Sequence, residues 1–240
     1  MEMVKPEPLV IDGRPYYTLT SYEPVTVEVD VHDITEEDVE QAMAFAIAQN
    51  GGGPDRLNDD AWIRDKFEGM HGAAELKSTI RSEMEAANQE MMEGQVAVAC
   101  ASELAKRLVQ RVTAEQVAAI RQDIEQSFEA TLAEQGATID LVLAQTGGSR
   151  AELDAMFDKQ ATQTAEQEAA VSAWAQKMGV TVSDDELALM IGGPVPAGQE
   201  EKLRAMAIQS RAMHMIMDEC SCTYTHDGGK QNDHPHLKLV

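Results

Sequence analysis

Apolar residues recur at spacings of three and four along most of the chain, which is the pattern of amphipathic helices. The longest such stretch runs from Ala74 to about Arg111. A single helix over this range would be about 55 Å long at 1.5 Å per residue, so it must protrude or serve as a backbone for other helices. Further helices are expected over residues 35–50, 59–67, 113–135, 138–145, 149–178, 183–191 and 198–218.

Four of these helices are expected to begin with a capping box, in which a hydroxyl side chain accepts a backbone N–H group of the first turn. The four starts are at Thr35, Thr113, Ser149 and Ser183. Each one precedes an apolar stripe, so each predicts a helix N-terminus. The glycine run that begins at Gly51 ends the first helix and is the clearest break in the chain.

The N-terminal region has a different pattern, because residues 25–31 alternate with a period of two. This predicts one strand or extended arm with the four valines of that stretch on one face. A lone strand does not form a sheet, so it is expected to pair with Leu9–Ile11, to pair with Tyr16–Leu19, or to lie along helices. Pairing with a second copy, giving a homodimer, is a further option.

These patterns divide the chain into an extended N-terminal arm (residues 1–33), a helical domain (34–219) and a flexible tail (220–240) that contains cysteines and histidines. The fold class is therefore all-α with a short extended β segment at the N-terminus. Composition agrees, because aromatic residues make up only 4% of the chain and the apolar content rests on helix formers and 14 Met.

The formal charge of −23 argues against some partners. A sequence-independent nucleic-acid binder needs cations, and an anionic membrane surface would repel this chain. No apolar run approaches the roughly 20 residues of a membrane span, and the N-terminus does not resemble a secretory signal. Three cysteines do not make a disulfide framework, so we expect a cytoplasmic protein with no nucleic-acid or membrane partner.

The chain contains none of the phosphate-binding, zinc-protease or nucleophile motifs that we sought. No catalytic residue is therefore assigned, and no cofactor is expected. One cluster has metal-ligand chemistry, since two thiols and two imidazoles suit tetrahedral zinc. Its members are Cys220, Cys222, His234 and His236. A Cys-x-Cys spacing is tighter than usual for zinc, so a tail without metal is the alternative.

Methionine is frequent, and it either fills irregular cores or lines surfaces that bind many partners. In the helix that starts at Ser149 the apolar stripe is interrupted by Gln160, Thr164 and Gln167 before it resumes at Trp174. A polar stretch between two apolar ends is compatible with a helix that lines a wet groove.

Several segments occur in a familiar order. The chain has LNDDAW at Leu57–Trp62, ELKSTIR at Glu75–Arg81, a helix followed by LVLAQTG at Leu141–Gly147, and WAQKMGVTVSDDEL at Trp174–Leu187. In this order and spacing they resemble the C-terminal chaperone domain of bacterial trigger factor. The resemblance implies an elongated, multi-helix body of the trigger factor and SurA type with a long arm helix.

The departures from the family are specific. No ribosome-docking loop of the GFRxGxxP type occurs, so ribosome docking is not expected. The segment Tyr22–Val29 resembles the connector before the family's FKBP-like isomerase domain, but the loop Gly51–Pro54 stands where that domain would be inserted. Isomerase activity is therefore not expected.

The resemblance implies an ATP-independent holdase that binds unfolded or nascent polypeptides in a helical cradle. The candidate client contacts are Met84, Met91, Met92, Met156, Phe157 and Trp174. Three alternatives stay open: a dedicated assembly chaperone that contacts one partner through the Cys/His tail, a residual prolyl isomerase, and a structural remnant without function.

Overall fold

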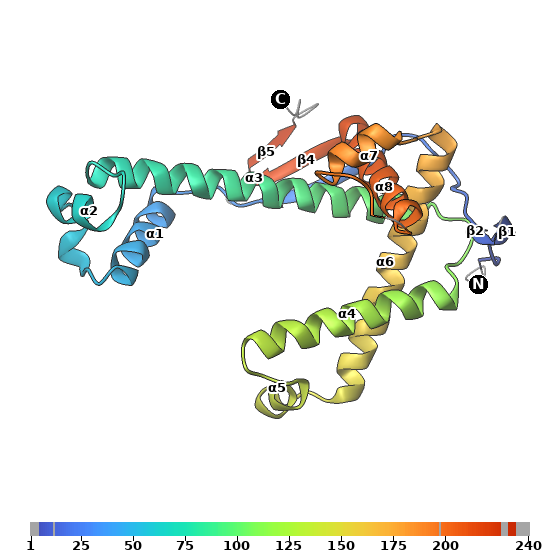
Figure 1. The fold of residues 1–240 in the computed structure, drawn as a ribbon, viewed down its shortest axis with the longest axis horizontal. Coiled ribbons are helices and arrows are strands. Elements are labelled where there is room, and N and C mark those ends of the chain that lie inside the picture. The colour runs from blue at the N-terminus through green and yellow to red at the C-terminus, as the bar shows by residue number, and fades with distance from the viewer. Residues whose placement is uncertain (1–4, 12, 197, 227–229, 234–240) are drawn as a thin grey trace. The chain divides into compact units, whose positions relative to one another are not determined.

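The structure is a computed structural model of the 240-residue chain, and it describes residues 5–11, 13–196, 198–226 and 230–233 (Figure 1). The helices in these residues are α1 (Glu36–Gln49), α2 (Asp60–Lys66), α3 (Ala73–Lys106), α4 (Ala114–Glu134), α5 (Ile139–Thr146), α6 (Arg150–Met178), α7 (Asp184–Met190) and α8 (Glu200–Glu219), with one 3-10 turn, η1 (Pro54–Arg56). The strands are β1 (Leu9–Ile11), β2 (Arg14–Tyr16), β3 (Thr26–Val31), β4 (Ser221–His226) and β5 (Lys230–Asp233). The prediction of a mostly helical fold with a long helix and a short β segment is confirmed.

The four predicted capping boxes are present. In each, the hydroxyl accepts the backbone N–H of the residue three positions on, and the side chain of that residue accepts the N–H of the cap. A cap of this kind contributes about 1 kcal/mol to helix stability. The capping residues are Thr35, Thr113, Ser149 and Ser183.

Helix α3 ends at Lys106, five residues before the predicted end. The backbone beyond it pairs with an earlier segment: Thr20 N–H donates to the carbonyl of Arg107 at 2.8 Å, and Val109 N–H donates to the carbonyl of Thr18 at 3.0 Å. Leu108 is buried, so the apolar spacing continues although the helix does not. At 34 residues the helix is about 51 Å long.

The chain divides into two compact units. Among the described residues, unit 1 takes in 5–27 and 97–221, and unit 2 takes in 28–96, 222–226 and 230–233. Unit 2 has a core in which α1, α2 and the first turns of α3 pack together. Its buried members are Val39, Met43, Ile47, Ile63, Leu76 and Ile80.

Unit 1 is organised around α6, which packs against both α4 and α8. The buried face of α6 consists largely of alanines at four-residue spacing, including Ala161, Ala165 and Ala169. Such small side chains leave room for neighbouring helices on either side. One turn before Ala161 on α6, the ring of Phe157 packs edge to face against the ring of Phe128 on α4, with ring centroids 5.6 Å apart.

The alternating valines behave as predicted, since Val25, Val27, Val29 and Val31 are all buried. Neither of the two predicted strand pairings is present, although the end of β3 lies beside helix α3, as the third alternative expected. Strand β1 pairs with β2, whereas β3 joins a three-stranded sheet in the order β3-β4-β5.

The sheet corrects the expectation of a flexible tail for residues 221–226 and 230–233. Strand β4 pairs antiparallel with β5. It is also attached to residues near β3, because Thr225 Oγ1 donates to Glu28 at 3.0 Å and His226 Nδ1 lies 2.7 Å from an Asp33 carboxylate oxygen. Threonine and tyrosine in this segment favour a strand.

Candidate functional site

A groove of about 1080 Å³ lies within unit 1, and we call it the α6–α8 groove. The β1–β2 hairpin, α6 and α8 supply most of its lining, and Gln116 of α4 adds one more side chain. Its floor is made of small residues on α6, chiefly Ala169 and Ala173, both buried. The hairpin brings Tyr16 and Tyr17 to one side.

Neutral hydrogen-bonding side chains occur at several points along this groove. Gln209 of α8 donates to Ser172 of α6 at 3.1 Å, which joins the two helices. The hydroxyl of Tyr17 donates to the side-chain oxygen of Gln116, and burial raises the pKa of the Tyr17 phenol. Tyr17 is therefore held as a neutral donor in its place at the edge of the groove.

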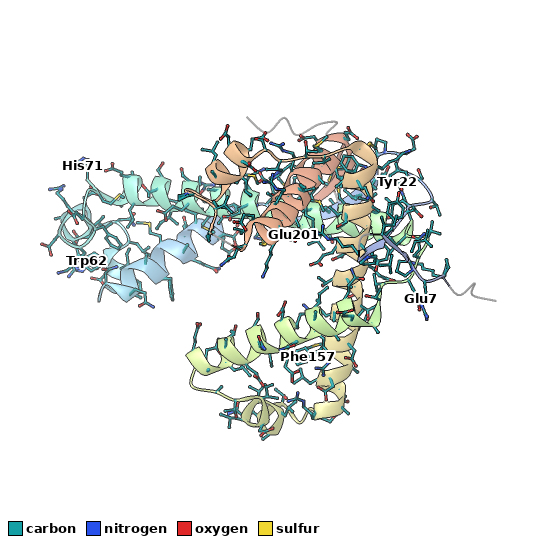
Figure 2. All side chains as sticks on the ribbon, turned by 45° about the vertical axis from the view of Figure 1, so that its right-hand side comes forward. Glu7, Tyr22, Trp62, His71, Phe157 and Glu201 are labelled. Atoms are coloured by element: carbon teal, nitrogen blue, oxygen red, sulfur yellow. The ribbon has the colours of Figure 1, made fainter. Side chains whose placement is uncertain are left out.

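Both positively and negatively charged side chains line the mouth of the groove. Arg14 forms an ion pair with Glu201, which is labelled in Figure 2. Glu168 is exposed as a whole residue, but the surrounding protein partly removes its carboxyl from water, which raises the pKa of that group. The nearby Asp123 carboxylate raises this pKa further. The mouth therefore contains acids and bases together, while the floor is apolar.

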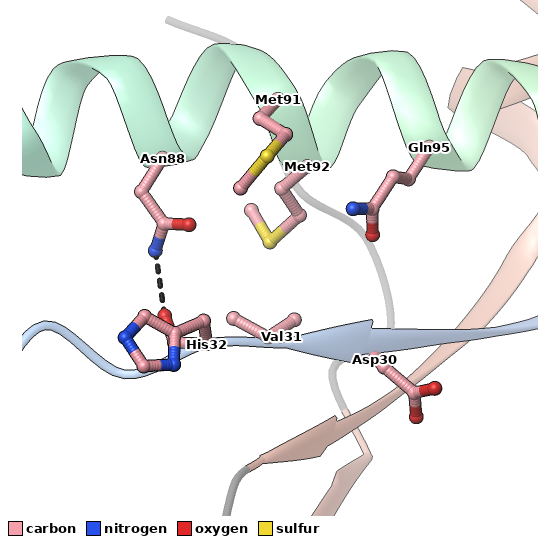
Figure 3. Close-up of a pocket in the computed structure, with 7 residues that line it drawn as sticks. All are labelled: Asp30, Val31, His32, Asn88, Met91, Met92 and Gln95. Atoms are coloured by element: carbon pink, nitrogen blue, oxygen red, sulfur yellow. Dashed lines mark hydrogen bonds between the residues drawn. The ribbon is translucent and has the colours of Figure 1, made fainter. Parts of the chain in front are cut away.

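A second, smaller hollow of about 230 Å³ lies within unit 2, between α3 and the end of β3 (Figure 3). Met91 and Met92 extend from α3 toward the strand, and we call the site the methionine hollow. Asn88 Nδ2 donates to the carbonyl of His32 at 2.8 Å, which fixes the strand end against the helix. Met91 is 52% exposed, so its thioether is open to solvent.

The structure thus brings two of the predicted contacts, Met91 and Met92, into one site. Met84 is partly buried against the core of unit 2, and Met156 is 50% exposed on α6. Phe157 and Trp174 are only 1% and 3% exposed. This near-complete burial makes both of them packing residues in this structure, and Phe157 packs against the ring of Phe128 on α4.

The proposed zinc ligands are placed only in part. Cys220 is buried and Cys222 is half-buried, while His234 and His236 lie outside the described residues. Within the described part of the chain, no group of three or more metal-binding side chains comes together.

The sequence indicated that the helix now seen as α6 could line a wet groove, but it pointed to Gln160, Thr164 and Gln167, none of which lines the α6–α8 groove. The actual lining of this groove was missed. Its floor is alanine, which carries little signal in a search for large apolar residues, and its wall is a short hairpin. The signal that was present is the Pro15-Tyr16-Tyr17 cluster, since aromatic residues are otherwise scarce in this chain.

Two further properties bear on function. Among the residues that the structure describes, no charged side chain is buried. In the same part of the chain, no helix combines the length and the apolar character that a membrane crossing requires.

Comparison with known proteins gives one family. The family model described as the bacterial trigger factor protein C-terminus matches residues 73–193, about half of the chain. No curated protein matches the chain. Among solved structures, the chain is similar to one described as the crystal structure of the hypothetical Mycoplasma protein MPN555, with 9% identity, coverage of 90% of this chain and 93% of that one, and a TM-score of 0.46.

Proposed function

Because this chain belongs to the bacterial trigger factor family through the family's C-terminal domain, we propose that it is an ATP-independent holdase for unfolded or nascent polypeptides. A chaperone role in general follows from the family. The holdase mechanism and the two binding sites, the α6–α8 groove and the methionine hollow, are the parts that we propose.

The observation that carries this proposal is the composition of the α6–α8 groove. Small-molecule sites usually measure 300–1,000 Å³, and this groove, at about 1080 Å³, lies just above that range. We infer that it accepts a short stretch of chain. Apolar side chains of a client would lie on the alanine floor beside Tyr16.

The polar groups of the groove suit the backbone of such a client. An unfolded segment brings one N–H and one C=O per residue, and these groups must find partners when water is removed. Gln176 and Gln209 can each donate and accept, so they can pair with backbone groups of any sequence. Recognition of backbone groups and generic apolar contacts fits a site for many clients.

The methionine hollow would add a second, weaker contact. Methionine is unbranched and polarisable, so it adapts to side chains of different shape. Between Arg81 and Lys106 helix α3 has five glutamates and no basic residue. This charge would keep the loaded chaperone in solution by mutual repulsion.

The remaining parts of the proposal follow from the sequence. We propose that the chain acts in the cytoplasm without a nucleotide, metal or other cofactor. Prolyl isomerase activity and ribosome docking are not part of the proposed function.

The test is aggregation of two unrelated, chemically denatured proteins after dilution, with and without a molar excess of this chain in nucleotide-free buffer. We expect suppression of both. Ala205→Glu places a carboxylate in the groove and should weaken suppression severalfold, whereas Met206→Glu, one residue on and outside the groove lining, is the matched control. For the hollow, Met91→Glu is paired with Ala86→Glu on the same exposed helix.

Protection of neither protein would refute the holdase proposal. Protection of one only would favour a dedicated chaperone for a single partner. Equal loss in Ala205→Glu and Met206→Glu would refute the assignment of the groove, provided that circular dichroism shows both variants folded.

A further inference from the structure

The β1–β2 hairpin forms one wall of the α6–α8 groove, and all of these elements belong to unit 1. Its two strands pair antiparallel, with Leu9 opposite Tyr16 and Ile11 opposite Arg14. A two-stranded hairpin is only marginally stable by itself in water. Its position over the groove therefore depends on how it is attached to the rest of unit 1.

The residues before the hairpin are attached to α6 and to the segment that follows α3. The backbone N–H of Arg111 donates to the carbonyl of Pro6 at 2.9 Å, and the Arg111 guanidinium forms an ion pair with Glu7. Lys5 Nζ lies 3.8 Å from a carboxylate oxygen of Glu166 on α6. The chain thus enters the hairpin from a fixed point.

The residues after the hairpin are attached more firmly. Tyr17 is 5% exposed, and its hydroxyl donates to the side chain of Gln116 on α4. The N–H of Thr18 donates to the side-chain oxygen of Gln110 at 2.8 Å, and the carbonyl of Thr18 accepts the N–H of Val109 at 3.0 Å. The chain thus leaves the hairpin at a second fixed point.

Between these two points the hairpin is held lightly. Among the residues that the structure describes, one ion pair, that of Arg14 with Glu201 of α8, makes the polar connection from the hairpin to the helices. Its side chains are 66% and 76% exposed, and ion pairs with such exposure contribute little stability. Strand β1 adds little packing, because Leu9 and Val10 are each 69% exposed.

We propose that the β1–β2 hairpin is a flap over the α6–α8 groove and that the Arg14–Glu201 ion pair is its latch. This inference rests on the proposed function, because it concerns how a client reaches that groove. When the latch opens, the hairpin turns about its two attached ends, which requires backbone changes in only a few residues. The alanine floor is then open to a client, and the flap closes over the bound segment with Tyr16 beside it.

The latch would control the rate of client exchange and leave the affinity nearly unchanged. A client must pass the flap both to enter and to leave, so a weaker latch speeds the two steps by a similar factor. Salt screens exposed charges, so a higher ionic strength should also open the flap more often. A side chain that only contacted the client would behave differently, since its loss would change the dissociation constant.

The first experiment measures access to the groove floor without a client. Ala173 lines the groove and is 3% exposed, so the variant Ala173→Cys places a thiol beneath the flap. A second change, Cys222→Ser, removes the half-buried native thiol and leaves the two buried ones. The rate at which a thiol reagent labels Ala173→Cys then reports flap opening. Adding Arg14→Glu should raise this rate by about fivefold, the most that an exposed ion pair usually changes an equilibrium.

Two further variants make the labelling result specific. The exchange Arg14→Glu with Glu201→Arg restores opposite charges and should return the rate close to that of the native latch. Glu200→Gln is the matched control, because Glu200 is adjacent to Glu201 in α8 and does not line the groove. Sodium chloride at about 0.5 M should speed labelling with the native latch and not with Arg14→Glu. Circular dichroism checks that each variant is folded.

The second experiment measures the binding and release of a dye-labelled, reduced and carboxymethylated protein that stays unfolded, with the native cysteines and Ala173 in place. Arg14→Glu should bind and release this protein about fivefold faster, with a dissociation constant within about twofold of the unmodified chain.

Several outcomes would overturn the flap. They are equal labelling rates with and without Arg14→Glu, a charge exchange that labels as fast as Arg14→Glu alone, and a changed dissociation constant with unchanged rates of labelling. Failure of the holdase proposal gives another result, in which labelling follows the latch as described while no variant binds the unfolded protein.

Discussion

Replacement of Phe157 by alanine tests whether this side chain serves packing or ligand binding. Phe157, which is labelled in Figure 2, is 1% exposed on α6. Its ring contacts that of Phe128 on α4 at a centroid distance of 5.6 Å. A buried Phe→Ala change costs about 3–5 kcal/mol, which includes the cavity that it leaves. We expect a value near 3 kcal/mol, because α4 can move toward the alanine face of α6 and fill part of the space.

This loss is large enough to measure directly. For a chain of this size, 1 kcal/mol corresponds to a change of roughly 2–4 °C in melting temperature, so Phe157→Ala should lower the melting temperature by about 6–12 °C. The assay is thermal unfolding followed by far-ultraviolet circular dichroism. Met156→Ala is the control, because Met156 is the adjacent residue and is 50% exposed, and its truncation should cost less than about 0.5 kcal/mol.

The opposite pattern would refute the packing argument. If Phe157→Ala melted within about 1 °C of the unmodified chain and instead lost the ability to hold a client, Phe157 would be a surface contact. The edge-to-face ring pair can be isolated with Phe128→Ala and the double variant, since the coupling of such a pair is about 0.5–1.5 kcal/mol.

Two further predictions concern stability. Glu186 caps α7 and pairs with Arg211, which lowers the pKa of its carboxyl to about 2. The pair therefore stabilises the fold above pH 4.5, and this contribution is lost as the pH falls through 2. Urea unfolding of Glu186→Gln should show a deficit at pH 7 that shrinks as the pH falls to 2, and a deficit independent of pH would contradict this. Gly179→Ala should destabilise the fold by about 1 kcal/mol, because Gly179 has a φ of +67° that an L side chain disfavours. Gly94→Ala in the interior of α3 has open space at its Cβ position and should stabilise the fold by roughly 0.5–1 kcal/mol. Thermal melts in which both changes have the same sign would refute the backbone argument.

Local signals in the sequence were sufficient for most of the helical fold. A capping box such as Ser149 with Glu152 involves residues three positions apart, so its structure is determined within one turn and can be recognised without knowledge of the rest of the chain. The buried valines of β3 follow from alternation in the same way. In each case the physical cause lies within a few residues of its effect.

The features that sequence analysis missed depend on distant partners. Helix α3 stops at Lys106 because the next residues bind the backbone of residues 18–20, and the apolar spacing on either side of the stop is the same. The tail forms strands because β4 has β3 as a neighbour, nearly 200 positions earlier. Patterns inside the tail do not reveal that neighbour.

The candidate sites divide in the same manner. Met91 and Met92 are adjacent in sequence and were found together, whereas the α6–α8 groove is assembled from the hairpin, α6 and α8. Phe157 was proposed as a client contact, and its burial was missed because it depends on Phe128 of α4, a partner that no pattern within α6 reveals. A hydrophobicity scale that gives most weight to large apolar side chains scores a helix with an alanine face as polar, although that face is buried.

The sheet order β3-β4-β5 also has a consequence for the synthesis of the protein. Helices such as α1 and α4 depend on neighbours in sequence and can form while the chain is still being made, but β3 (Thr26–Val31) has its strand partner in β4 (Ser221–His226). At 5–20 residues per second the ribosome reaches β4 roughly 10–40 s after β3. Until then the backbone edge of β3 lacks its strand partner. A protein that we propose to hold incomplete chains is, for that interval, an incomplete chain itself.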